Sequence, residues 1–122
     1  MKVLVVEDEP NNMVLMKSIL KHYGHETIEA FTGEEGLEKA AASRPDLILM
    51  DIRLPGIDGL ETTRRIRKME NMVDVPIIAV SSYAIDDDLE MLRKAGCNGS
   101  LQKPINPTTI NDTIMGIIKA TK

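Results

Sequence analysis

The chain contains 122 residues, of which 43% are hydrophobic and 28% are charged, and its formal net charge is −4. This length and composition are typical of one soluble globular domain with a core of ordinary size. Sequence-independent nucleic-acid binding requires a basic surface, so the acidic balance argues against it. A basic stretch does exist, but we interpret it as the solvated face of a helix; it comprises Arg64, Arg65, Arg67 and Lys68.

Membrane and secretion signals are not visible in the sequence. No apolar run reaches the roughly 20 residues that a transmembrane helix needs, and the apolar stretch after Lys2 is too short for a secretory signal. Cys97 is the single cysteine, which excludes an internal disulfide and fits a reducing compartment. We therefore expect a cytoplasmic protein with neither a membrane nor a nucleic acid as its partner.

The first third of the chain predicts strand, helix and strand. The apolar run Val3–Val6 is typical of a strand that is covered on both faces. Pro10 suits the first turn of a helix, and apolar residues recur at helical spacing from Met13 until Gly24 ends the pattern. Residues Thr27–Ala30 predict the second strand.

The middle of the chain repeats this alternation. Thr32 and Glu35 have the spacing of a capping box at the start of a second helix. The apolar run 47–50 predicts the third strand. After a loop rich in proline and glycine, Asp58 is a suitable N-cap for a helix that runs to Lys68.

The last third predicts two more strands and two more helices. Ile77–Val80 is the fourth strand, and the next helix has an apolar edge from Ile85 to Leu92. A weaker strand pattern at Ser100–Gln102 precedes a final helix, expected over Pro107–Ile118. Alternating strands and helices predict a doubly wound α/β domain with a parallel sheet. No linker interrupts the pattern, so we expect one domain over residues 1–122.

Charged residues follow three of the predicted strands. Glu7 and Asp8 come after the first strand, Asp51 after the third and Lys103 after the fifth. In a parallel sheet these positions meet outside the carboxyl ends of the strands, where such folds bind ligands. Crowded carboxylates raise the cost of ionising one another, and a hard divalent cation with a preference for oxygen relieves that cost. The sequence therefore predicts a Mg²⁺ site built around an aspartate.

These motifs, taken in order, resemble those of the receiver domains of two-component response regulators. They are Glu7-Asp8, Asp51, Ser81 and Lys103-Pro104, and the stretch Asp51–Gly59 is similar to the phosphoacceptor loop of that family. The resemblance covers essentially the whole chain. It implies a flavodoxin-like five-stranded parallel sheet of order 2-1-3-4-5, flanked by five helices.

The resemblance also implies a metal site and a phosphoacceptor. Asp51 would accept a phosphoryl group from a sensor histidine kinase or a phosphotransfer protein. Asp8, Asp51 and the backbone carbonyl of Arg53 would bind Mg²⁺ directly, and Glu7 would act through a metal-bound water. The protein would catalyse its own phosphorylation and dephosphorylation without being a turnover enzyme.

Two further positions complete the implied phosphoryl site. Ser81 would hydrogen-bond a phosphoryl oxygen. Lys103 would pair with Asp51 before the reaction and with the phosphoryl group after it. A mobile ammonium with three donors suits this change of partner, and phosphoryl transfer requires charge stabilisation at the equatorial oxygens.

The output implied by the resemblance is phosphorylation-dependent contact with a downstream protein. The surface that the family usually uses corresponds here to Ile85–Ala95, Ser100–Gln102 and Pro107–Ile118. Phosphorylation would shift a two-state equilibrium of this surface.

The chain departs from the family pattern on the fifth strand, where Ser100 stands in place of a switching aromatic residue. Serine cannot supply the apolar burial of an aromatic ring. Our hypothesis is therefore that the switch runs through the backbone of Ser81–Ala84, with Tyr83 moving instead. Arg53 and Tyr83 are also expected to flank the entrance of the hydrolytic water and to prolong the life of the phosphoryl group.

Two other interpretations stay open at this point. A haloacid-dehalogenase-type phosphatase also uses a strand-end aspartate and Mg²⁺, but that class has a second aspartate two residues later, where this chain has Arg53. The other interpretation is a receiver domain cut from a hybrid kinase or a larger regulator, which the initial Met1 and the absence of a linker argue against. Glycine-rich nucleotide-binding motifs do not follow the first strand.

Overall fold

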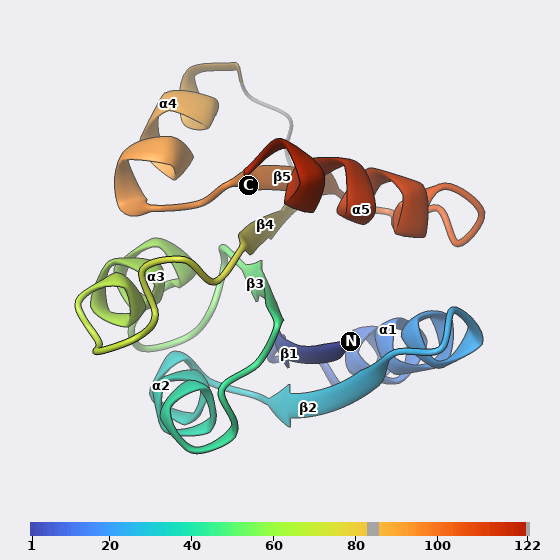
Figure 1. Ribbon diagram of the computed structural model, residues 1–122, viewed down its shortest axis with the longest axis horizontal. Coiled ribbons are helices and arrows are strands. Elements are labelled where there is room, and N and C mark those ends of the chain that lie inside the picture. The colour runs from blue at the N-terminus through green and yellow to red at the C-terminus, as the bar shows by residue number, and fades with distance from the viewer. Residues whose placement is uncertain (83–85, 122) are drawn as a thin grey trace.

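One parallel sheet lies at the centre of the protein, with its strands in the order β2-β1-β3-β4-β5 (Figure 1). The computed structural model describes residues 1–82 and 86–121, and for residues 86–88 it describes the backbone alone. The strands are β1 (Lys2–Val6), β2 (Glu26–Ala30), β3 (Leu47–Asp51), β4 (Ile77–Ser81) and β5 (Gly99–Gln102). All four strand pairs are parallel. The predicted flavodoxin-like order is therefore confirmed.

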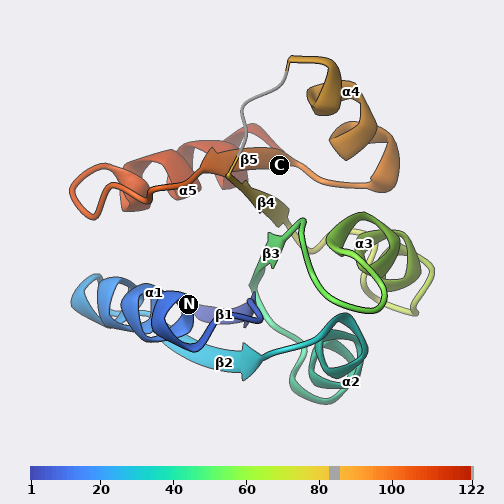
Figure 2. The same cartoon turned by 180° about the vertical axis from the view of Figure 1, so that it is seen from behind.

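Five helices cover the two faces of this sheet. They are α1 (Pro10–His22), α2 (Gly33–Ser43), α3 (Gly59–Arg67), α4 (Asp86–Ala95) and α5 (Ile110–Ala120). Figures 1 and 2 show α1 and α5 on one face and α2, α3 and α4 on the other. None of the helices in the described ranges has the length and apolar character needed to cross a membrane.

Side chains alternate along each strand and so build two separate cores. Val3 and Val5 of β1 pack in a cluster with α1 and α5, whereas Leu4 and Val6 pack in a cluster with the helices of the other face. Because both faces are covered, β3 is buried at every position. Burial of these apolar side chains is the main term that fixes the sheet between its helices.

Local signals in the sequence set most of the helix starts. The side chain of Thr32 accepts a hydrogen bond from the Glu35 backbone N–H at 3.0 Å, and Asp58 accepts one from the Glu61 N–H at 2.8 Å. Both residues are the predicted N-caps. Pro10 occupies the first turn of α1, and Gly24 adopts a φ of +82° just after the helix ends.

Two expectations from the sequence are wrong in detail. The last helix begins at Ile110 and not at Pro107. The side-chain oxygen of Asn106 accepts a hydrogen bond from the backbone N–H of Thr108, and its carbonyl accepts one from Ile110, so these residues form a turn that precedes the helix. Arg67 does not belong to a solvated face. Its guanidinium turns inward and donates to backbone carbonyls of the α3–β4 segment and to the carbonyl of Gly96.

Candidate functional site

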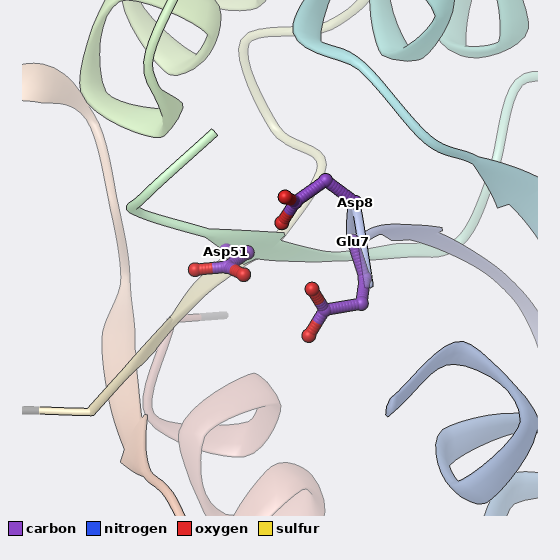
Figure 3. A group of neighbouring side chains, drawn as sticks. All are labelled: Glu7, Asp8 and Asp51. Atoms are coloured by element: carbon purple, nitrogen blue, oxygen red, sulfur yellow. The ribbon is translucent and has the colours of Figure 1, made fainter. Parts of the chain in front are cut away.

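Three carboxylates meet at the carboxyl edge of the sheet. One oxygen from each of Glu7, Asp8 and Asp51 lies within 4.8 Å of the others. Figure 3 shows Glu7 and Asp8, at the end of β1, facing Asp51 across a common space. Glu7 and Asp51 are each only 6% exposed, whereas Asp8 is exposed. The pairing of β1 with β3, in which Val6 lies opposite Met50, brings these residues together.

Lys103 extends its ammonium group into this acidic cluster. Its Nζ atom lies 2.9 Å from Glu7 Oε1 and 3.2 Å from Asp51 Oδ2. The backbone N–H of Lys103 donates to the carbonyl of Ser81 at 2.7 Å. This bond holds the segment after β5 beside the end of β4, so one cation is positioned against two buried acids.

Backbone donors fix the orientation of the two buried carboxylates. The N–H of Arg53 donates to Asp51 Oδ1 at 3.0 Å, and the N–H of Glu9 donates to Glu7 Oε2 at 3.2 Å. Because Lys103 donates to Asp51 Oδ2, each carboxylate oxygen of Asp51 accepts a hydrogen bond. A side chain at Gly59 would collide with the Asp51 carbonyl, so glycine allows α3 to start this close to the site.

Burial and the neighbouring charges together shift two pKa values in the cluster upward. Burial raises the pKa of the Glu7 carboxyl above 4.5, and Asp51 adds to this rise while the hydrogen bond from Lys103 opposes it. Burial by itself would lower the pKa of the Lys103 ammonium, but its hydrogen bond to Glu7 and the charge of Asp51 outweigh burial and raise it. Without a bound cation the site thus holds a firmly protonated lysine and an acid that ionises reluctantly.

The remaining expected site residues lie around this centre. Ser81 ends β4 and is partly exposed. Arg53 lies in the loop after β3, and its side chain is exposed. Tyr83, Ala84 and Ile85, which our switching hypothesis and output surface include, lie outside the described residues.

The expected pairing of Lys103 with Asp51 is present, and the pairing of Lys103 with Glu7 was not anticipated from the sequence. Both contacts are present, and the one to Glu7 is the shorter. The sequence held a signal for it, because Glu7 directly follows the buried strand β1 and its carboxylate needs a partner once it is buried.

Comparison with known proteins identifies the family. The model of the response regulator receiver domain family matches residues 3–115. The chain belongs to this family. It is therefore a receiver domain of the response regulator type and not a turnover enzyme, so the phosphatase interpretation is set aside.

Individual relatives are similar to this chain over nearly its full length. The polar-differentiation response regulator DivK of Brucella anthropi is 40% identical over 112 residues, which are 92% of this chain and 91% of that protein. The receiver domain of the sensor histidine kinase PA1611 of Pseudomonas aeruginosa superposes with a TM-score of 0.88 at 36% identity, covering 97% of each chain. That crystal structure has a magnesium ion coordinated in its active-site cleft.

A chemotaxis protein has the same architecture. CheY4 of Vibrio cholerae superposes with a TM-score of 0.91 at 28% identity, covering 95% of this chain and 97% of that one. The receiver fold is thus shared by relatives from cell-differentiation, kinase and chemotaxis systems.

Proposed function

We propose that Asp51 accepts a phosphoryl group from a phosphohistidine on a sensor histidine kinase or a phosphotransfer protein. The observation that carries this proposal is the bridge of Lys103 between Glu7 and Asp51 at a cluster of three carboxylates. A buried carboxylate whose two oxygens are held by fixed donors is positioned for attack along one direction.

The acidic cluster suits a resident Mg²⁺ ion. Three carboxylate oxygens within 4.8 Å form the hard oxygen donor set that Mg²⁺ prefers. In this proposal Asp8, Asp51 and the backbone carbonyl of Arg53 bind the ion directly, and Glu7 binds it through a water. When bound, the ion supplies positive charge that offsets both the crowded acids and the incoming phosphoryl oxygens.

The residues of the chain carry out the transfer in this proposal. A carboxylate oxygen of Asp51 attacks phosphorus, the bond from phosphorus to the imidazole nitrogen breaks, and its electron pair stays on that nitrogen. Lys103 moves from Asp51 toward a phosphoryl oxygen, which its flexible stem allows. The Ser81 hydroxyl donates a hydrogen bond to another phosphoryl oxygen.

The product is proposed to signal through a surface on α4, β5 and α5. Residues 86–95, Ser100–Gln102 and Pro107–Ile118 form this surface, with 107–109 as the turn before α5. Leu89 and Met91 on α4 and Met115 on α5 are large apolar side chains exposed to solvent. In this proposal these side chains contribute to the contact with a protein partner. The proposed setting of kinase, receiver and target is the cytoplasm.

Incubation with Mg²⁺ and acetyl phosphate, followed by intact-mass measurement, tests the chemistry. We expect the mass to increase by one phosphoryl group in the native protein and to stay unchanged in Asp51→Asn, which keeps the size of the side chain but lacks the nucleophile. An equal gain in Asp51→Asn would contradict the assignment. Pull-down with and without phosphorylation then tests the output surface, with Leu89→Ser and Met115→Ser expected to reduce capture.

A further inference from the structure

The first residue of α2 lies in close contact with the segment that follows Asp51. Gly33 is buried, and a Cβ atom added to it would overlap Thr62 Oγ1 and lie only 2.6 Å from Ile57 Cγ1. Thr62 belongs to α3, and Ile57 belongs to the loop 52–58 that joins β3 to α3. Both views of the fold show α2 beside α3 on the same face of the sheet (Figures 1 and 2). Only a residue without a side chain allows α2 and this loop to come so close.

A second close contact joins the start of α3 to the end of β3. A Cβ atom on Gly59 would overlap the Asp51 carbonyl oxygen, and the Gly59 N–H donates to the Ile52 carbonyl at 2.9 Å. The Thr62 hydroxyl donates to the Asp58 carbonyl at 2.7 Å, which ties the end of the loop to the helix. The start of α3 is therefore in contact with both α2 and the backbone of Asp51.

Other residues of loop 52–58 also lie against α2. Leu54 is buried in the core cluster that contains Ala40 of α2. Gly56, which has a φ of +76°, lies so near Glu34 that an added Cβ atom would be 3.5 Å from Glu34 Oε2. Helix α2 therefore supports the loop at three positions, of which the contact made by Gly33 is the tightest.

The same loop contains a proposed metal ligand whose position depends on the backbone alone. The carbonyl of Arg53 cannot swing toward an ion by a change of side-chain rotamer, so the path of the loop sets its place. Mg²⁺ requires nearly octahedral coordination with ligand oxygens at about 2.0–2.1 Å. A shift of the loop by a fraction of an ångström is therefore enough to weaken binding of the ion.

We propose that Gly33 is a positioning residue for the Mg²⁺ site. Its contact with Ile57 and Thr62 holds loop 52–58, and with it the Arg53 carbonyl, at the place that the ion requires. This inference rests on the proposed function and deepens it, because it makes the metal affinity depend on a helix that supplies none of the proposed ligands.

Gly33→Ala tests the inference, because the added methyl group must push Thr62 and Ile57 away. We expect calorimetric titration to give a Kd for Mg²⁺ about tenfold above that of the native protein, which is the usual scale for changes outside the ligand shell. The Kd for Ca²⁺ should rise only about twofold, since Ca²⁺ accepts longer and more variable ligand distances. A general loss of stability would not change the ratio of the two Kd values.

Thr62→Ala should rescue this variant, because it removes the oxygen nearest to the added methyl group. The Asp58 carbonyl keeps a donor, since it also accepts the backbone N–H of residue 62 at 2.9 Å. The partly exposed Ile57 side chain can turn to another rotamer. In the double variant of Gly33→Ala and Thr62→Ala we expect the Kd for Mg²⁺ to return to within about threefold of the native value.

Leu20→Val is the matched control for a change in stability. Leu20 is a buried residue of α1 in the core cluster on the other face of the sheet. Its replacement should lower the urea midpoint and leave the Kd for Mg²⁺ at the native value.

Ile57→Ala is a second variant, and it adds no atom that the fold must accommodate. It removes the loop side of the contact and should raise the Kd for Mg²⁺ about threefold. A native Kd in either Gly33→Ala or Ile57→Ala would overturn the inference and leave the proposed function in place, as would a defect of Gly33→Ala that Thr62→Ala does not relieve. Absence of Mg²⁺ binding and of phosphorylation in the native protein would instead refute the proposed function and the inference with it.

Discussion

At the scale of single residues, the site is governed by an excess of acids over cations. Lys103 neutralises part of the charge of Glu7 and Asp51, but one ammonium cannot offset three carboxylates. The excess of negative charge makes Glu7 harder to ionise, since its pKa is raised mainly by burial and further by Asp51. This imbalance is what a divalent cation relieves, and it makes the site responsive to the arrival of another anion.

The first prediction concerns Glu7 and pH. A carboxyl whose pKa is raised on folding contributes stability that is fully present below its ordinary pKa of 4.5 and is lost as the pH rises through the raised value. Glu7→Gln stays neutral, so without metal it should be more stable than the native protein at pH 7.5 and similar to it at pH 4. Urea denaturation in the presence of a chelator measures this, and Glu38→Gln on the exposed side of α2 is the control. Equal stability of the two proteins at pH 7.5 would contradict the argument.

The second prediction concerns Arg53, two positions after the proposed phosphoacceptor. Its side chain is exposed in the loop after β3, and our hypothesis is that it narrows the approach of the hydrolytic water to the phosphorylated Asp51. Arg53→Asn should therefore speed dephosphorylation severalfold and leave the uptake of phosphoryl groups intact. Loss of the phosphoryl mass over time measures the rate, with Arg65→Asn on α3 as the control. An unchanged rate in Arg53→Asn would show that the side chain does not restrict water.

At the scale of elements, one arginine joins the end of α3 to the segment before β4 and to the more distant segment between α4 and β5. The guanidinium of Arg67, at the end of α3, donates to the carbonyls of Met72 and Val75 before β4 and to that of Gly96 after α4. It also donates to Asn98 Oδ1, which accepts the backbone N–H of Ile77 as well. Burial lowers the pKa of this guanidinium, yet every donor in the fork geometry has a suitable acceptor.

The third prediction is that Arg67→Met destabilises the fold by about 2–3 kcal/mol, because it leaves several half-buried carbonyls without their donor. The matched control is Arg65→Met on the same helix, whose partner is the exposed Glu61 and whose loss should change little. Urea midpoints of the two variants measure the difference. Similar midpoints would mean that water replaces Arg67 at no cost.

At the scale of the whole molecule, the sequence predicted the topology because the signals for it are periodic and repeated. Strand-end acids, caps such as Thr32 and Asp58, and apolar runs of strand length recur in a regular order. The inward turn of Arg67 was not predictable, since most of its acceptors are backbone carbonyls, which carry no side-chain signature. The start of α5 was missed for a related reason: Asn106 and Pro107 favour a turn and a helix start equally well.

The same reasoning explains which parts of the site could be predicted. Parallel strands with a common carboxyl edge bring Asp8, Asp51 and Lys103 together regardless of loop detail. Which charged groups pair with one another depends on differences of about an ångström in side-chain position, and no sequence pattern encodes these. The shared pairing of Lys103 with Glu7 and Asp51 is of this kind.

The last prediction links the acidic site to the stability of the entire fold. A ligand that binds only the folded state stabilises it by mass action, by about 2.7 kcal/mol at a concentration one hundred times its Kd. Mg²⁺ should therefore raise the midpoint of thermal unfolding in a saturable manner at pH 7.5, where relief of the repulsion around Glu7 adds to the effect. Asp8→Asn should abolish most of this rise because it removes a direct ligand of the proposed site. Sodium chloride at matched ionic strength is the control for general screening, and an equal rise with sodium chloride would show that the cluster does not select a divalent cation.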